Sequence, residues 1–212
     1  MVDVGANIGV MTSVLSRKVG PAGRVIAFEP HPEMFRQLEH NVQRWRPRRV
    51  KTVNKAVSSH TAKAWIKEEV CFAVNEGTAK IVNCDAEERT FDVASIRLDE
   101  ALPGDSCRVI KIDVEGHEFD VLSGALRLLA SGGVRDIVLE STWEYPSPPQ
   151  KLLLKYGYQV FDLRTSFLGP LLKRPEKRTS LSGRVSDYVA TLNGERANRL
   201  LNPAGWQLLG VG

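Results

Sequence analysis

Two acidic residues and a glycine-rich loop stand at spacings suited to binding a nucleoside. The chain begins MVDVGANIGV, where Gly5 permits a tight turn and Gly9 permits close packing of a helix on a strand. A ligand can then approach backbone N–H groups at the positive end of that helix. About 20 residues after Gly9, Glu29 follows a second apolar segment, where its carboxylate can accept hydrogen bonds from both hydroxyls of a ribose. These residues predict a ligand that contains an adenosine.

The spacing of the glycines distinguishes between adenosine cofactors. Dinucleotide enzymes use G-x-G-x-x-G, but Asn7 and Val10 occupy the second and third glycine positions of that pattern here. The order D-x-G-x-x-x-G, which begins at Asp3, instead resembles the first motif of class I S-adenosylmethionine-dependent methyltransferases. In that motif the acid on the first strand faces the methionine end of the cofactor. We therefore expect S-adenosyl-L-methionine and not NAD.

A second group of ionisable residues follows a later apolar segment. The sequence IKIDVEGHEFDVLSGA places Asp113, Glu115, His117 and Glu118 directly after a predicted strand. In a doubly wound sheet we expect this strand beside the first one, so its carboxyl end opens on the same crevice. The sequence thus predicts that all four groups converge on the cofactor site.

The elements that position these residues alternate between strand and helix. Short apolar segments predict strands, and apolar residues at helical spacing predict helices between them. Strands are expected at residues 2–4, 24–29, 50–57, 108–113 and 136–141, a sixth strand follows a short helix within 149–163, and a last strand lies at 186–192. Other helices are expected within 10–19, after Pro32 and over 116–130.

This alternation indicates an α/β fold with a doubly wound, mostly parallel sheet. Residues 60–98 are less regular and predict a β-rich insertion of hairpins or edge strands at 64–66, 80–82 and 90–96. A basic loop rich in proline and glycine is expected over 164–184. No domain boundary is evident, so we expect residues 1–212 to form a single domain.

The quoted motifs, taken together, closely resemble one family. VDVGANIG, FEPHPEMF, NKAVSS and IKIDVEGHEFDVLSGA agree in order and spacing, over roughly residues 2–163, with the FkbM family of methyltransferases. The resemblance implies a seven-stranded sheet whose last strand is antiparallel. It also implies methylation of hydroxyl groups on polyketide-type natural products or on sugars of glycans and glycolipids.

The resemblance assigns roles to single residues. It matches Asp3, Gly5, Asn7 and Gly9 to the first motif, Glu29 to the ribose-binding acid, and Asp113, Glu115 and Gly116 to the acidic motif, and it places Ala56 and Val57 near the adenine. Family members usually carry residues before the first strand, whereas this chain starts within it. A truncated start and a minimal protein with an open pocket are both consistent with this difference.

Methyl transfer to an alcohol requires alignment of the reactants and removal of a proton. We expect His117 to act as the base and Asp113 to orient the cofactor's ammonium group or the acceptor. Asp113 and Glu140 both end strands and are a possible carboxylate pair for a divalent cation, but two carboxylates are too few to predict a metal site.

Composition leaves two other functions open. The net charge is +4 and the pI about 9.0, with basic clusters at 44–51 (RWRPRRVK) and 173–178 (KRPEKR). These clusters fit nucleic-acid methylation, although the fourth strand lacks the PPY-type tract with which such enzymes stack a flipped base. A non-catalytic cofactor-binding module is the third possibility.

Cys71, Cys84 and Cys107 suggest neither a disulfide framework nor a zinc site. We expect a cytoplasmic protein because no membrane span or secretory signal is evident.

Overall fold

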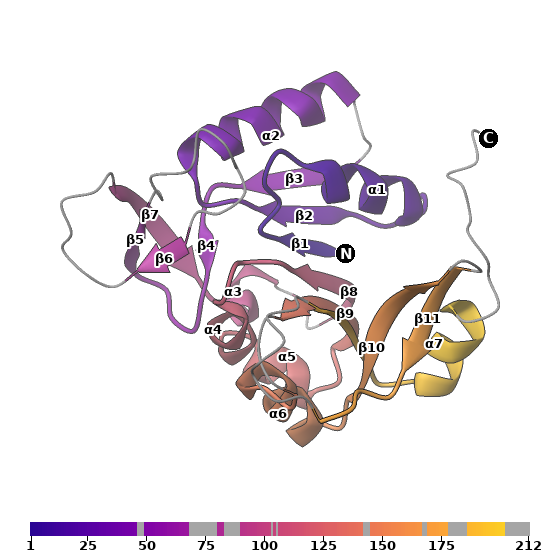
Figure 1. The fold of residues 1–212 in the computed structure, drawn as a ribbon. Coiled ribbons are helices and arrows are strands. Elements are labelled where there is room, and N and C mark those ends of the chain that lie inside the picture. The colour runs from indigo at the N-terminus through magenta and orange to yellow at the C-terminus, as the bar shows by residue number, and fades with distance from the viewer. Residues whose placement is uncertain are drawn as a thin grey trace.

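The protein is built on a large twisted sheet with helices on both faces and a second, smaller sheet at one end (Figure 1). A computed structural model describes residues 1–45, 49–67, 80–82, 90–102, 104, 106–141, 145–166, 169–177 and 186–201. Cys71, Cys84 and the central arginines of the first basic cluster lie outside these ranges, whereas Cys107 is a buried free thiol.

Eight strands form the large sheet. In sheet order they are β11 (Gly169–Lys173), β10 (Gln159–Ser166), β12 (Ser186–Thr191), β9 (Val134–Ser141), β8 (Cys107–Ile112), β1 (Val2–Val4), β2 (Val25–Phe28) and β3 (Val50–Val53). The pairs that β1 forms with β2 and β8 are parallel, as are the β2–β3 and β8–β9 pairs. The predicted doubly wound, mostly parallel sheet is therefore confirmed.

The far edge of the sheet departs from the expected number of strands. β12 runs antiparallel between β9 and β10, as the family resemblance implied for the last strand. The expected basic loop over 164–184 is partly wrong, because β10 continues to Ser166 and residues Gly169–Lys173 form β11, which pairs antiparallel with β10. Gly169, the first residue of this eighth strand, pairs with Ser166 and has φ +127°, a conformation that favours glycine.

One face of the large sheet carries the main apolar core. Alternate strand residues, among them Val4, Ile112 and Leu139, point to this face and are almost fully buried. They pack against α4 (Glu118–Ser123), α5 (Leu126–Ala130) and α6 (Pro148–Lys155), which supply Val121, Leu129 and other buried side chains. The register of the strands thus places residues 4, 112 and 139 in the core and their neighbours on the opposite face.

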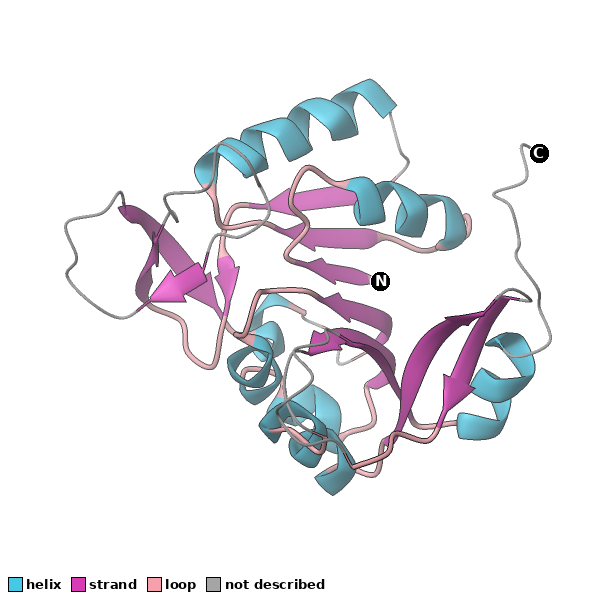
Figure 2. Ribbon diagram, viewed as in Figure 1, coloured by secondary structure: helices cyan, strands magenta, loops and turns pink. Residues whose placement is uncertain are grey.

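The opposite face is covered by three other helices, α1 (Val10–Lys18), α2 (Pro32–Trp45) and α7 (Gly194–Leu201). Ala27 packs against Leu38 of α2, and Val189 packs near Ala197 of α7. Figure 2 shows α1 and α2 above the sheet and α4, α5 and α6 below it. None of the helices in the described ranges is both long and apolar enough to cross a membrane.

The helix predicted over 116–130 is divided in two. α4 ends at Ser123 and α5 begins at Leu126, because Gly124 packs against the backbone of Ser58 so closely that a Cβ there would lie 2.0 Å from the Ser58 oxygen. The Asp99 carboxylate, next to the start of the short helix α3 (Leu98–Ala101), accepts hydrogen bonds from the N–H groups that begin α5. Tertiary contacts therefore override the helical periodicity of the sequence.

The small sheet consists of four strands in the order β4 (Ala56–Val57), β7 (Thr90–Ile96), β5 (Lys63–Lys67) and β6 (Lys80–Val82). It confirms the β-rich insertion over 60–98. The strand predicted over 50–57 is instead two strands, since β3 belongs to the large sheet and β4 pairs with β7. In Figure 1, β1 runs from the marked N-terminus towards the small sheet, which therefore lies near the carboxyl ends of the parallel strands.

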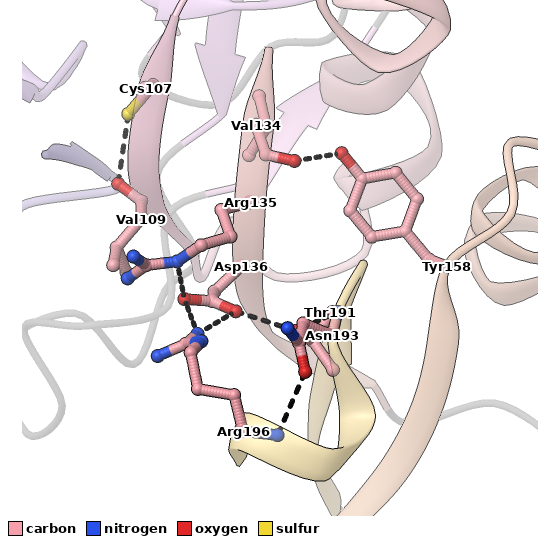
Figure 3. A network of polar contacts seen from close by, with 9 residues as sticks. All are labelled: Cys107, Val109, Val134, Arg135, Asp136, Tyr158, Thr191, Asn193 and Arg196. Atoms are coloured by element: carbon pink, nitrogen blue, oxygen red, sulfur yellow. Dashed lines mark hydrogen bonds and ion pairs between the residues drawn. The ribbon is translucent and has the colours of Figure 1, made fainter. Parts of the chain in front are cut away.

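A polar network fastens α7 to the opposite end of the sheet (Figure 3). Asp136 at the start of β9 accepts hydrogen bonds from the Thr191 hydroxyl (2.7 Å), from Arg135 (2.9 Å) and from Arg196 of α7. Burial acts to raise the pKa of Asp136, but the hydrogen bonds from Thr191, Arg135 and Arg196 together hold it below the ordinary value. The ionised form of Asp136 therefore stabilises the folded protein.

Replacing Asp136 by Asn tests this network. Because hydrogen bonds to charged groups contribute about 1.5–3 kcal/mol each, we expect the free energy of unfolding at pH 7 to fall by about 2 kcal/mol. Since the pKa is lowered by folding, the wild-type advantage should shrink as the pH falls through the folded-state pKa. Glu33→Gln is the matched control: its ion pair with Arg36 is exposed, and its loss should cost less than about 0.5 kcal/mol in urea denaturation. Equal losses in the two variants would contradict the assignment.

Candidate active site

The glycine loop after β1 has a conformation that its sequence dictates. Gly5 has φ +74°, and a Cβ at this position would lie 1.8 Å from the backbone oxygen of Asp113. The N–H groups of Gly5 and Ala6 donate to the Phe28 carbonyl oxygen at 3.1 and 2.9 Å. Asn7 also lies in the left-handed region, with φ +50°. The loop is thereby held against the ends of both β2 and β8.

A lysine whose side chain is 13% exposed lies beneath this loop. Lys111 of β8 donates a hydrogen bond of 2.8 Å to the Gly5 carbonyl oxygen, and its ammonium group lies 3.4 Å from Asp3 and 3.3 Å from Asp113. The Thr12 hydroxyl of α1 donates to the other oxygen of Asp3 at 2.6 Å. Burial raises the pKa of Asp3, and the contacts with Lys111 and Thr12 act against that rise. Lys111 thus joins the first-strand acid, the loop and the acid after β8.

The carboxylate of Glu29 is fixed at the end of β2. It is 6% exposed, and its two oxygens accept hydrogen bonds from the backbone N–H groups of Asn7 (2.7 Å) and His31 (2.9 Å). Each carboxylate oxygen can accept more than one hydrogen bond, so both retain capacity for a ligand. Burial raises the pKa of Glu29, and the two N–H groups act to lower it.

A cavity of about 250 Å³ opens between the carboxyl ends of the parallel strands and the small sheet. One part of its wall is polar and the other is apolar. The polar lining residues are Asn7, Glu29, His31, Lys55, Asp113, Glu115 and Glu140, and the others are Val4, Gly5, Phe28, Pro30, Met34, Ala56, Val57, Ile66 and Val114. Eight of the residues singled out in the sequence therefore meet here: Gly5, Asn7, Glu29, Ala56, Val57, Asp113, Glu115 and Glu140.

Two residues of the first motif do not line the cavity. Asp3 is fully buried beneath the loop, in contact with Lys111 and Thr12. Gly9 has φ +95°, and a Cβ there would lie 2.6 Å from the Leu38 side chain. The expected close packing at Gly9 is therefore present, but the partner is helix α2 and not a strand.

Of the four ionisable groups expected to converge after β8, the structure brings two to the cavity wall. Asp113 and Glu115 line the cavity, whereas His117 and Glu118 do not. Glu115 and Gly116 adopt left-handed conformations, with φ +50° and +97°, that turn the chain into α4. The Glu118 carboxylate, 3% exposed, accepts the N–H of Gly116 at 2.9 Å.

His117 lies at the N-terminus of α4 between two polar partners. Its Nε2 is 3.1 Å from the Ser58 hydroxyl, and its Nδ1 is 3.4 Å from a carboxylate oxygen of Asp120. Burial lowers the pKa of His117, although Asp120 acts to raise it. Both ring nitrogen atoms of His117 thus lie against polar groups of the protein.

Glu140, at the end of β9, adds an acid to the cavity wall next to Asp113. Burial raises the pKa of Glu140 to about 7, and a hydrogen bond with Asp113 and the negative charges of Asp113, Glu115 and Asp187 contribute to the rise. In the part of the chain that the structure describes, no group of three or more His, Cys, Asp or Glu side chains is arranged to hold a metal ion. At neutral pH the Glu140 carboxyl is therefore present in both protonated and ionised forms.

Residues 3–160, which include every element around this cavity, match the methyltransferase FkbM domain. The chain belongs to the FkbM methyltransferase family. A curated relative, the hexuronic acid methyltransferase AglP of Haloferax volcanii, is 33% identical over 132 residues, or 61% of this chain and 51% of that protein. The chain thus spans about half the length of that relative.

Solved structures confirm the fold of this FkbM domain. The FkbM methyltransferase from Methylobacillus flagellatus matches with a TM-score of 0.56 and 19% identity, over 90% of this chain and 42% of that one. A precorrin-6y C5,15-methyltransferase from Geobacter metallireducens matches with a TM-score of 0.50 and 18% identity, over 90% and 79% of the two chains. The large sheet is therefore that of the class I methyltransferase fold.

Several residues around the FkbM cavity were not identified from the sequence. Lys111 carried one signal, because a lysine within the apolar segment RVIKID predicts a buried charge that needs a partner. Lys55 and Ile66 carried none, since they reach the cavity only through the arrangement of the small sheet. His31 caps α2 by accepting hydrogen bonds from the N–H groups of Glu33 and Met34.

A comparison of two glycines in the FkbM motifs tests the packing of the loop. Gly5 and Gly116 both have positive φ, so alanine at either position carries strain of about 1–2 kcal/mol. A Cβ at Gly116 meets no atom within 4 Å, whereas one at Gly5 collides with Asp113. We expect Gly5→Ala to lower the free energy of unfolding by at least about 2 kcal/mol more than Gly116→Ala. Equal losses in urea denaturation would show that the loop relaxes without cost.

Proposed function

We propose that this protein is an S-adenosylmethionine-dependent methyltransferase that methylates a hydroxyl oxygen of a sugar or another small natural product. The observation that carries the proposal is the Glu29 carboxylate, which is fixed by the N–H groups of Asn7 and His31 on the cavity wall. A carboxylate in this position suits the two adjacent hydroxyls of a ribose. Membership of the FkbM methyltransferase family supports the same function.

The lining residues suit the separate parts of this cofactor. The ribose hydroxyls would bind Glu29, and the adenine would lie against the buried side chains of Ala56 and Val57. The methionine end would lie by the glycine loop, where Asp113 and Glu115 can accept hydrogen bonds from its ammonium group. When bound, this cofactor supplies an electrophilic methyl group, and the chain's own task is to align it with the acceptor.

Asp3 and Gly9 support cofactor binding indirectly in this proposal. Asp3 holds Lys111 beneath the glycine loop, and Gly9 lets α2 approach the start of α1. Both residues therefore shape the loop that contacts the cofactor. His117 as the base remains a prediction, and its side chain does not line the cavity.

The proposed acceptor is a carbohydrate or small-molecule hydroxyl. The relative from Haloferax volcanii is named for methylation of a hexuronic acid, which supports a sugar acceptor. Asp113, Glu115 and Glu140 on the cavity wall favour a neutral group at the reacting position, because their charges would repel an acceptor carboxylate there.

We propose that the two sheets act as one methyltransferase domain. The small sheet supplies Ala56, Val57 and Ile66, and the large sheet supplies Glu29 and Asp113 to the same cavity. Neither sheet by itself would enclose a ligand.

Calorimetry on the purified chain tests cofactor choice. We expect binding of S-adenosylmethionine and of its demethylated product, and no binding of NAD, because Asn7 stands where a dinucleotide site has its second glycine. Glu29→Gln should weaken binding about tenfold or more, since a hydrogen bond to a charged group contributes about 1.5–3 kcal/mol. Glu39→Gln, a matched change at an exposed position of α2, should leave affinity as it is in the wild type. NAD binding without S-adenosylmethionine binding would refute the proposed function.

A further inference from the structure

Three carboxylates lie side by side on one face of the large sheet. Ile112 of β8 pairs with Leu139 of β9. The residues that come next, Asp113 and Glu140, therefore lie side by side on neighbouring strands. On its other side Glu140 pairs with Asp187 of β12. Glu140 is therefore the middle member of the row, at the carboxyl edge of the sheet.

Of this row, Asp113 and Glu140 line the cavity and Asp187 does not. Glu140 is within hydrogen-bonding reach of Asp113, and two carboxyl groups can share a hydrogen bond only if one of them carries a proton. Lys111, on the neighbouring strand β8, contacts Asp113 at 3.3 Å and Asp3 at 3.4 Å. Among the described residues Glu140 has no lysine or arginine partner, so the shared proton is better placed on Glu140.

The charged groups around Glu140 are those of three neighbouring elements. Lys111 lies on β8, Asp113 and Glu115 lie in the segment that follows β8, and Asp187 lies on β12. Burial, together with these acids, places the pKa of Glu140 at about 7. A carboxyl group with such a pKa can accept a proton and release it again near neutral pH, which suits a general base.

We propose that Glu140 is the general base of the reaction and that its carboxylate accepts the proton of the acceptor hydroxyl. This inference rests on the methyl transfer proposed above. The acceptor O–H bond breaks and its proton moves to Glu140, while the acceptor oxygen gains the methyl group and the electron pair of the former sulfur–methyl bond stays on sulfur. The products are a methyl ether, S-adenosylhomocysteine and protonated Glu140, which returns its proton to solvent.

The position of Glu140 distinguishes it from His117. Glu140 lies on the cavity wall, whereas the His117 ring lies between Ser58 and Asp120 and outside that wall. A base must come within about 3 Å of the hydroxyl or reach it through one water molecule. Of the two residues, only Glu140 lines the cavity proposed to hold the cofactor.

Carbon-13 NMR of the glutamate-labelled protein with bound S-adenosylhomocysteine tests the inference without turnover. The Glu140 carboxyl signal is assigned by its loss in Glu140→Gln. We expect an apparent pKa of about 7 for this signal, as a property of the Asp113–Glu140 pair. An ordinary glutamate value of about 4.3 would overturn the proposal.

Single-turnover kinetics with methyl β-glucuronide as acceptor supply the second test. The wild-type rate should rise with pH through about 7, because only ionised Glu140 accepts a proton. Glu140→Gln should lose about 100-fold or more of the rate and this pH dependence, while its Kd for S-adenosylhomocysteine stays near that of the wild type. A loss below about tenfold would overturn the role of Glu140.

Two further variants make the kinetic test specific. Asp187→Asn removes a neighbouring negative charge that raises the pKa of Glu140, so the rise in rate should move to lower pH with little loss at the plateau. If His117→Ala lost about 100-fold of the single-turnover rate while Glu140→Gln stayed active, the base would be His117 and not Glu140. If the wild type binds S-adenosylhomocysteine but does not methylate the glucuronide, the proposed acceptor is wrong, and the NMR titration still decides the role of Glu140.

Discussion

A buried ion pair between Asp3 and Lys111 joins the elements that form the cavity. Removing two charges from water is costly, and breaking such a pair by deleting one partner typically costs about 3–5 kcal/mol. The same ammonium group also binds the Gly5 carbonyl oxygen and contacts Asp113. One side chain on β8 thus fixes the loop after β1 and the acid after β8 relative to each other. An apolar residue at position 111 would fill the space without linking the three groups.

The cavity combines groups that differ in how firmly they are held. Glu29 and the glycine loop are tied together by backbone hydrogen bonds, which fix their geometry before a ligand arrives. Ala56, Val57 and Ile66 contribute only apolar surface from the small sheet. Such a division suits a site that must hold a rigid nucleoside at one end and expose a reactive group at the other. The row of acids on β8, β9 and β12 stands at that second end.

Much of the fold follows from local sequence, and less of the site does. Strands such as Val25–Phe28 are short apolar segments beside clear helices, so their periodicity identified them. The glycine loop and Glu29 were recognisable because their chemistry depends on spacing along the chain. The break at Gly124 and the approach of Ile66 depend on contacts between distant segments, which periodicity does not encode. His117 shows the same limit, since two left-handed residues before it redirect a side chain whose position in the sequence pointed to the cavity.

The place of β12 in the sheet has a consequence for how the chain folds. Among the described residues β12 comes after β9 and β10 in the sequence, yet it lies between them and pairs with both. During synthesis β9 and β10 therefore emerge before the strand that separates them, and they cannot complete their ladders until residue 191 has left the ribosome. Their unpaired edges are exposed in that interval, and such edges are templates for pairing with other chains. Chains that stop before β12 should consequently aggregate, even though every residue of the cavity wall has already been made.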